Sequence, residues 1–312
     1  MLSLAAILYF VVPLGVLSMV TNYPPYSFEK VLQSEKLRND YGINQNSSPK
    51  DYGFYSDEIS FISLDSTRLS AWWVPAKQPV AKSIVFVHGR TSNRLKTMKY
   101  LAMIDSLQLD STYNVFIPDL RNSGKSQQTK TYMGYKFGED LTASLQLLKE
   151  RYHQDTVILY GFSMGAMAIL NATGRSQLKS ILRNEHIAVI KIVLDSPLAN
   201  VKATLTDQAM DMPLADVLVD KVYELYGNEI NGFEDSMKLS VLLDKHIPAL
   251  IVQSRDDKLT KTYILRQELL LLQDYPLLDT AFFDGPDHVK LFQDERTQAA
   301  YIETVGSFLE AH

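Results

Sequence analysis

The stretch TVILYGFSMGAMAIL (156–170) joins a β-branched apolar run to a series of small helix-forming residues. The first part is typical of a strand buried on both faces, and the second part is typical of a helix. Between them lies Gly161-Phe162-Ser163-Met164-Gly165. A glycine two residues to either side of a serine lets the backbone pass closely through a sharp turn that holds the hydroxyl outward. We interpret Ser163 as a nucleophile; an ordinary strand, turn and helix is the alternative.

Strand and helix patterns alternate along most of the chain around this stretch. Such alternation indicates a mostly parallel sheet with helices on both faces, which is an α/β fold. A hairpin over 58–76 leads into the sheet, and a long helix-like insertion at about 198–246 interrupts it. The other predicted strands are 82–89, 113–121, 187–197, 247–254 and 279–285, and the predicted helices are 27–39, 95–107, 138–152, 260–274 and 289–311.

Composition limits the classes of function. The chain has 312 residues, of which 46% are hydrophobic, and this length suits one large domain or two small ones. The net charge is −5 with no basic block, which argues against a nucleic-acid partner. The absence of cysteine excludes thiol nucleophiles, disulfides and thiolate metal sites.

The N-terminus carries the uncharged stretch LSLAAILYFVVPLGVLSMV (2–20), which is long enough to cross a membrane as a helix. We favour an uncleaved single-pass anchor over residues 1–22. A cleaved signal peptide, which would leave a secreted or periplasmic protein, is the alternative, and a buried core helix is another. No basic residue precedes the apolar run, and LSMVTN is a poor cleavage site. Residues 23–54 are predicted to be a linker with a short helix, and 55–312 the main domain.

Residues capable of chemistry follow nearly every predicted strand. Binding sites in parallel sheets form just beyond the carboxyl ends of the strands, so these residues are expected to meet. They are His88, Asp119, Arg121, Ser163, Asp195, Asp256, Asp257 and His288.

A serine hydroxyl needs a neighbouring base, and His288 is the best candidate. It follows the last strand on a turn rich in glycine, proline and aspartate. His88 ends a strand but precedes a glycine, and it would most simply position the loop. The remaining histidines lie at the opposite end of the sheet or at the C-terminus, and we expect them to be surface or packing residues: His153, His186, His246 and His312.

A carboxylate must orient the base, and three candidates exist. We favour Asp257, because the chain order Ser163, Asp257, His288 is the order used by enzymes with such a serine turn. Asp256 would point elsewhere on the same turn. Asp195 is more suited to bracing loops around the nucleophile, although an acid at that strand end is geometrically possible.

A negatively charged oxygen that forms during attack must also be held. The backbone N–H of Met164 begins the helix after Ser163, where unpaired N–H groups and the helix dipole favour negative charge. The second donor is expected from the loop after His88, at the N–H of Arg90. Asp119 and Arg121 are expected to brace loops.

Taken together, FVHGR, DLRNSGKS, GFSMGA, LDSP, QSRDDKLT and GPDHVK resemble the motifs of α/β-hydrolases, in the family's order. Within that superfamily the chain is similar to membrane-anchored serine-aminopeptidase-like and monoacylglycerol-lipase-like hydrolases. Two departures are Gln253-Ser254, where the family has His-Gly, and Asn122 in place of a glycine. The resemblance implies an α/β-hydrolase fold whose helical cap is the insertion at 198–246.

The implied reaction is hydrolysis of a carboxylic ester, thioester or amide through an acyl-enzyme, with no metal or organic cofactor. The expected substrate is a small or lipid-like acyl compound; the natural substrate and the oligomeric state stay open. Two alternatives keep the fold: a non-catalytic binding module, and an acyltransferase or cofactor-free peroxidase. Most of the apolar stripe at 210–227 is expected to pack on the body, and a minority to line an acyl pocket.

Overall fold

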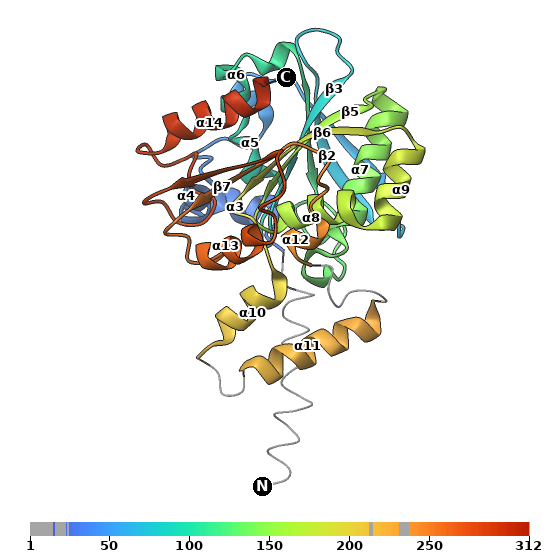
Figure 1. Ribbon diagram of the computed structural model, residues 1–312. Helices are drawn as coiled ribbons and strands as arrows, with labels where there is room; N and C mark the ends of the chain where they lie inside the picture. Colours follow the sequence, from blue (N-terminus) through green and yellow to red (C-terminus); the bar gives the residue numbers. More distant parts are fainter. Residues whose placement is uncertain (1–14, 16–22, 24, 212–214, 231–236, 312) are drawn as a thin grey trace.

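The centre of the computed structural model is an eight-stranded sheet in the order β1-β2-β4-β3-β5-β6-β7-β8 (Figure 1). β1 pairs antiparallel with β2, and β2 pairs antiparallel with β4, whereas every other pairing is parallel. The predicted α/β fold, with a hairpin leading into a mostly parallel sheet, is therefore confirmed. The structure describes all residues except 1–14, 16–22, 24, 212–214, 231–236 and 312. The strands are β1 (Asp57–Ile62), β2 (Arg68–Val74), β3 (Lys82–Val87), β4 (Asn114–Asp119), β5 (Thr156–Phe162), β6 (Ala188–Asp195), β7 (Ala249–Ser254) and β8 (Leu278–Phe283).

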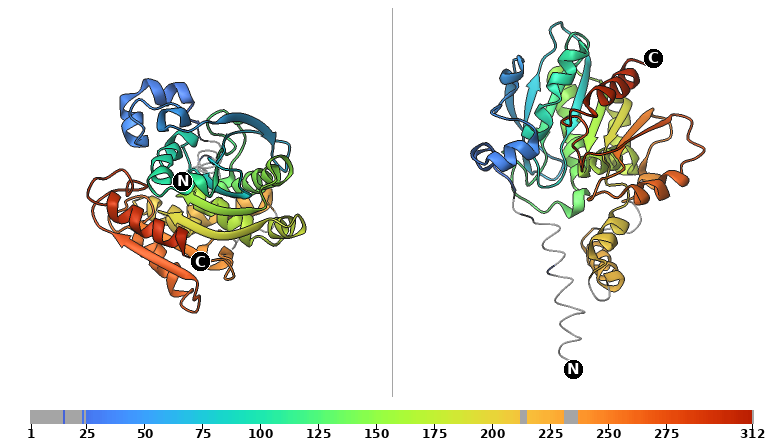
Figure 2. Two further views of the ribbon diagram at one scale, coloured as in Figure 1. Left: turned by 90° about the horizontal axis from the view of Figure 1, so that it is seen from above. Right: turned by 90° about the vertical axis from the view of Figure 1, so that its left-hand side faces the viewer.

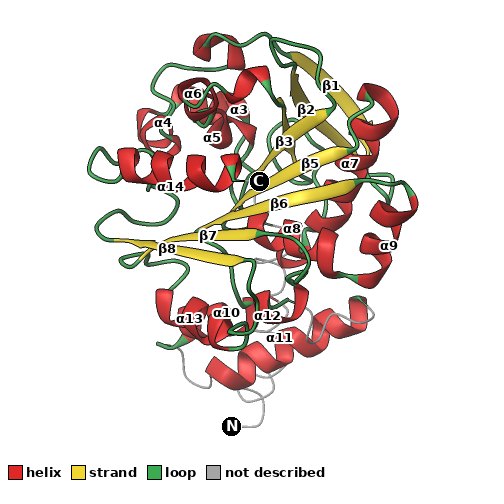
Figure 3. Ribbon diagram, turned by 45° about the horizontal axis from the view of Figure 1, so that its top comes forward, coloured by secondary structure: helices red, strands yellow, loops and turns green. Residues whose placement is uncertain are grey.

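Helices cover both faces of the sheet, which explains why each central strand contains apolar side chains on both faces. Successive side chains of a strand point to opposite faces. Val85 and Val87 of β3 belong to one buried cluster, and Ile84 and Phe86 of the same strand belong to the other. Figure 3 shows α7 (Phe137–Tyr152), α8 (Met164–Gly174) and α9 (Ser176–Asn184) on one face. The opposite face carries α3 (Phe28–Gln33), α4 (Glu35–Tyr41), α5 (Arg94–Met98), α6 (Leu101–Ser106) and α14 (Gln298–Glu310). The remaining helix beside the sheet is α13 (Thr262–Leu270).

The segment 23–54 departs from the prediction of a linker. It holds two helices rather than one, because Ser34 ends α3 and its hydroxyl accepts a hydrogen bond from Leu37 N at 3.3 Å to begin α4. Val31 and Tyr41 are fully buried in the same cluster as Phe86. The segment is therefore part of the domain, and Figure 2 shows it lying against the body.

Two predicted helices are shorter than their sequence patterns indicated. The helix expected at 95–107 is broken into α5 and α6. The helix expected at 289–311 begins only at Gln298, and residues 291–297 form turns and a bend. Val289 has a positive φ of 52°, which lies outside the α-helical region. The Val289 N–H donates to the Ser196 hydroxyl at 3.3 Å, and this hydrogen bond holds the turn after His288.

The insertion at 198–246 contains α10 (Val201–Ala209), α11 (Ala215–Glu229) and α12 (Leu239–Leu242). Figure 1 shows α10 and α11 below the main body. Val219, Val222 and Tyr223 are buried in the cluster on the α8 side of the sheet, as expected for packing on the body. Met210 is 67% exposed.

None of the helices in the described part of the chain has the length and apolar character needed to span a bilayer. Apart from Gly15, the predicted span at 2–20 lies outside the described residues.

Candidate active site

Ser163 occupies the turn between β5 and α8 in a strained conformation. Its φ is +55° and its ψ is −117°, a region that L-residues rarely adopt. The Ser163 N–H donates to the carbonyl oxygen of Asp195 at 2.9 Å, and the Ser163 carbonyl accepts from Leu198 N at 3.2 Å. The backbone is thus held from both sides, and these bonds maintain the sharp turn predicted from the glycine spacing.

Two glycines allow the chain to close around this turn. A Cβ on Gly165 would lie 2.0 Å from the carbonyl oxygen of Val87, at the end of β3. A Cβ on Gly89 would lie 3.0 Å from Ser163 Cβ. The loop after β3 therefore touches the serine turn and the start of α8, and Arg90 of this loop lines the same pocket as Ser163.

His288 and Asp257 come from the loops that follow β8 and β7, and they meet. His288 Nδ1 lies 2.8 Å from Asp257 Oδ2. Asp257 is buried, and its Oδ1 accepts hydrogen bonds from Leu259 N and Thr260 N, both at 2.8 Å. Burial alone would raise the pKa of Asp257, but the hydrogen bond and charge of His288 and the bonds from Thr260 hold that pKa below its usual value. The carboxylate is therefore ionised and oriented toward the imidazole.

Two further residues position this carboxylate, and the sequence analysis missed both roles. Thr260 Oγ1 donates to Asp257 Oδ2 at 2.8 Å and lies 3.2 Å from His288 Nδ1. Gln253 Nε2 donates to Asp257 Oδ2 at 3.1 Å. Gln253 was noted only as a departure from the family's pattern. Its amide lies at the end of β7, where a side chain can reach back to the acid.

The other two acid candidates have different partners. Asp256 is exposed, and its Oδ2 accepts from Gly285 N at 2.7 Å. Asp195 is fully buried, and it accepts from Tyr301 Oη at 2.6 Å and from Ser196 Oγ at 2.9 Å. Burial raises the pKa of Asp195. Since Ser196 Oγ also accepts from Val289 N, Asp195 braces the turn beside His288.

His88 is a buried structural residue. Its Nε2 accepts from Leu120 N at 3.0 Å, and its Nδ1 lies 2.8 Å from the carbonyl oxygen of Gly89. These partners fit a neutral ring that donates through Nδ1, and burial lowers the pKa of His88. The imidazole therefore ties the loops after β3 and β4 together.

Asp119 and Arg121 serve the same loops. Asp119 Oδ1 accepts from Arg94 N at 2.8 Å. The buried Arg121 guanidinium donates to Asp140 at 2.7 Å and to Asp65 at 2.6 Å. His153, His186 and His246 are exposed, as expected for surface residues, and His312 lies outside the described residues.

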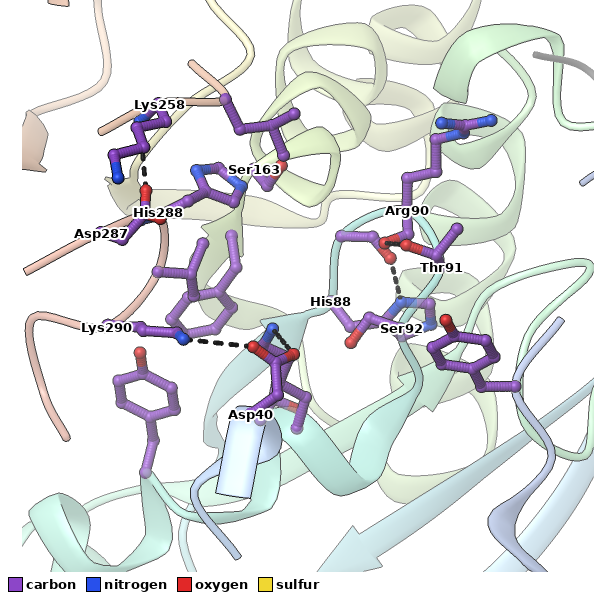
Figure 4. A pocket seen from close by; sticks show the side chains of 18 residues that line it. Asp40, His88, Arg90, Thr91, Ser92, Ser163, Lys258, Asp287, His288 and Lys290 are labelled. Carbon is purple, nitrogen blue, oxygen red and sulfur yellow. Dashed lines mark hydrogen bonds and ion pairs between the residues drawn. The ribbon is translucent and has the colours of Figure 1, made fainter. Parts of the chain in front are cut away.

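Ser163 and His288 line one pocket with a volume of about 460 Å³ (Figure 4). Gly89 and Phe162 form part of its wall. None of the cap residues that the structure describes lines this pocket, so the expected contribution of the apolar stripe is not found there. Within the described ranges, no cluster of three acidic or histidine side chains could hold a metal ion.

Comparisons with known proteins bear on the fold of the chain. A family model for the alpha/beta hydrolase fold matches residues 82–230. YfhR of Escherichia coli strain K12 is 25% identical over 174 residues, which are 54% of this chain and 55% of YfhR. YqkD of Bacillus subtilis strain 168 is 33% identical over 100 residues, or 32% of each chain. The chain thus spans about half the length of YfhR and less of YqkD.

Solved structures share the architecture over most of the chain. A Pyrococcus furiosus esterase has a TM-score of 0.64 at 23% identity, over 85% of this chain and 95% of the esterase. Mouse alpha/beta hydrolase domain-containing protein 10 has a TM-score of 0.52 at 16% identity, over 81% of this chain and 98% of the mouse chain. At such identities the likeness shows the fold. The sheet order, the family model and these structures show that the chain has the α/β-hydrolase fold.

Proposed function

We propose that the protein is a serine hydrolase that cleaves a carboxylic ester, thioester or amide through an acyl-enzyme. The observation that carries the proposal is the 2.8 Å contact between His288 Nδ1 and Asp257 Oδ2, in a pocket that Ser163 shares with His288. Strain at Ser163, a buried ionised carboxylate at Asp257 and the imidazole of His288 in the pocket of Ser163 suit nucleophilic catalysis. The likeness to the Pyrococcus furiosus esterase supports the same class of reaction.

The proposed mechanism has two halves. Ser163 Oγ attacks the acyl carbon while His288 Nε2 takes the hydroxyl proton, and Asp257 stabilises the imidazolium through Nδ1–H. The N–H groups of Met164 and Arg90 hold the oxyanion. The tetrahedral intermediate then expels the alcohol, thiol or amine, which takes the proton from His288. Water repeats the sequence on the acyl-enzyme, releasing the acid and restoring Ser163.

Labelling of the full-length chain with a fluorophosphonate tests this proposal. We expect Ser163→Ala and His288→Ala to abolish labelling, whereas Ser176→Ala, at an exposed serine on α9, keeps it. Peptide mapping should find the adduct on Ser163. A folded wild-type protein that does not react would contradict the proposal and favour a non-catalytic binding module.

We also propose that residues 2–20 anchor the protein in a membrane, on the ground of their uncharged apolar sequence. The hydrolase domain would then act close to a membrane, which fits a lipid-like acyl substrate. Fractionation of cells expressing the full-length chain tests the anchor. Retention of the protein in the membrane fraction after alkaline carbonate treatment is expected, and its release at full length would contradict the proposal.

A further inference from the structure

The pocket that holds Ser163 and His288 is positively charged, although the whole chain has a net charge of −5. Six charged side chains line it: Arg90, Lys96, Lys258 and Lys290 are cations, and Asp40 and Asp287 are carboxylates. Four positive and two negative groups leave +2. Since the rest of the molecule is acidic, this sign is a local property of the pocket.

Two of the cations lie on the loops that carry the proposed acid and base. Lys258 directly follows Asp257, and Lys290 lies two residues after His288. Asp287 Oδ1 accepts from Lys258 N at 3.1 Å and from His288 N at 2.8 Å. The same hydrogen bonds that fix the base therefore also fix the backbone of Lys258.

The two carboxylates of the pocket pair with groups other than the Lys258 ammonium. Asp40 forms ion pairs with Lys96 and Lys290, and Asp287 accepts hydrogen bonds from backbone N–H groups. Within the described part of the chain, no acidic group forms an ion pair with the Lys258 ammonium, which is exposed at the pocket mouth. Lys258 is therefore available to a ligand.

Lys290 also belongs to a second cluster of positive charge, which lies around Asp40 of α4. Asp40 bridges Lys96 at 3.1 Å and Lys290 at 3.3 Å, so one carboxylate is shared by two ammonium groups (Figure 4). Lys99 lies buried close by and donates to Gln293 Oε1 at 2.7 Å. Burial first, and then the charge of Lys96, lower the pKa of Lys99 to about 7, and Lys290 acts in the same direction.

We propose that this pocket selects acyl substrates that carry a carboxylate or phosphate group a few bonds from the scissile carbonyl, bound by Lys258 and Lys290. The inference rests on the proposed serine-hydrolase function and names its substrate class. Lys258 and Lys290 flank His288, so an anionic group between them holds the carbonyl near Ser163. Asp40 competes with the substrate for Lys290 and thereby limits the preference.

The test compares matched neutral and anionic esters on the full-length protein. For an anion on the acyl side, the pair is 4-nitrophenyl butyrate and mono-4-nitrophenyl glutarate. For an anion on the alcohol side, it is a monoacylglycerol and the corresponding monoacylglycerol 3-phosphate. The readout is the ratio of kcat/KM for the anionic ester to that for the neutral ester, so that a general loss of activity cancels.

We expect Lys258→Met and Lys290→Met each to lower this ratio roughly three- to tenfold. Asp40→Asn should change it in the opposite direction, raising it roughly two- to fivefold, because Lys290 loses its competing carboxylate. Raising the salt concentration from about 50 mM to about 500 mM should reduce the wild-type preference. Lys149→Met is the control, since Lys149 pairs with Asp155 at 3.3 Å and does not line the pocket.

The pair that responds identifies the side of the substrate that carries the charge. A ratio that the lysine variants leave unchanged, or that Lys149→Met changes equally, would overturn the inference. Fluorophosphonate labelling distinguishes a failure of the proposed substrate class from a failure of the proposed hydrolase function. Labelling of Ser163 without charge selectivity refutes the substrate class alone, whereas no labelling refutes the hydrolase function itself.

Discussion

His288 Nδ1 and Asp257 Oδ2 lie 2.8 Å apart, although 31 residues separate them along the chain. The parallel pairing of β7 with β8 creates this contact, because both strands end at the same edge of the sheet. Each loop then adds its own hydrogen bonds, with Thr260 on one side and Asp287 on the other. The proposed acid and base are therefore positioned by the sheet and adjusted by the loops.

The first prediction concerns the proposed acid. Asp257→Asn should lower kcat for a chromogenic ester by roughly a thousandfold or more, because an amide does not hold the imidazole in the required tautomer. Asp256→Asn is the matched control one residue away, and it should keep activity within a few-fold. Steady-state kinetics on both variants check this. A larger loss in Asp256→Asn than in Asp257→Asn would show that the assignment is wrong.

The second prediction tests whether Asp195 has a structural role or a catalytic role. Asp195→Asn should lower the free energy of unfolding by roughly 2 kcal/mol, because Asp195 accepts hydrogen bonds from Tyr301 and Ser196 inside the core. Labelling of Ser163 should survive at temperatures where the variant is folded. Denaturant unfolding and fluorophosphonate labelling measure the two effects. Lost labelling with unchanged stability would instead make Asp195 the acid.

The third prediction follows from strain at the nucleophile. Ser163→Ala and Ser163→Gly should both be inactive, but Ser163→Gly should be more stable by about 1 kcal/mol, because glycine tolerates a φ of +55°. Denaturant unfolding of the two variants provides the comparison. Equal stability would mean that the turn carries no strain in solution.

The fourth prediction tests the close approach of α8 to β3. Gly165→Ala should cost roughly 3 kcal/mol, because its Cβ would meet the carbonyl oxygens of Val87 and His88. Gly53→Ala is the comparator: its Cβ would meet nothing within 4 Å, so only its φ of +84° should cost about 1 kcal/mol. Thermal unfolding of the two variants checks that Gly165→Ala loses more stability than Gly53→Ala. A Gly165→Ala variant as stable as the wild type would contradict the close packing of α8 against β3 at the proposed oxyanion site.

The fifth prediction is a pH dependence of stability. The pKa of Lys99 is lowered to about 7 in the folded state from 10.5 in an unfolded chain. Between these values the unfolded state binds more protons, so stability rises with pH as the folded-state penalty is relieved. Lys99→Met should therefore stabilise the protein by roughly 1–3 kcal/mol below pH 7 and by much less near pH 10.

Denaturant titrations of wild type and Lys99→Met at several pH values between about 6 and 10 measure this difference. Lys125→Met serves as the control, because Lys125 is 49% exposed and pairs with Glu58 on the surface. A stabilisation by Lys99→Met that grows with pH would contradict the burial of a neutral amine at this position.

Most of the fold could be predicted from hydrophobic periodicity, and the failures have local causes. The strands buried on both faces were predicted because each contains a continuous apolar run. The helix predicted at 289–311 begins only at Gln298, and the bond from Val289 N to Ser196 at its start joins residues that are distant in sequence, so the hydrophobic pattern carries no signal of it. The linker predicted at 23–54 failed because burial of Val31 and Tyr41 depends on a surface supplied by distant strands.

By itself, the sequence determined the α/β class, the sharp turn at Ser163 and the choice of Asp257 and His288 as proposed partners. The alternation of strand and helix patterns, the glycine spacing and the order of residues along the chain can all be read without knowledge of any tertiary contact. Only the tertiary structure decided which side chains support them. Gln253, Thr260 and Ser196 act through hydrogen bonds between neighbouring loops, and polar residues in loops carry no periodic signal. The charge of the pocket also depends on the tertiary structure. Asp40 and Lys290 are remote in sequence, and they meet only because α4 packs beside the turn after β8.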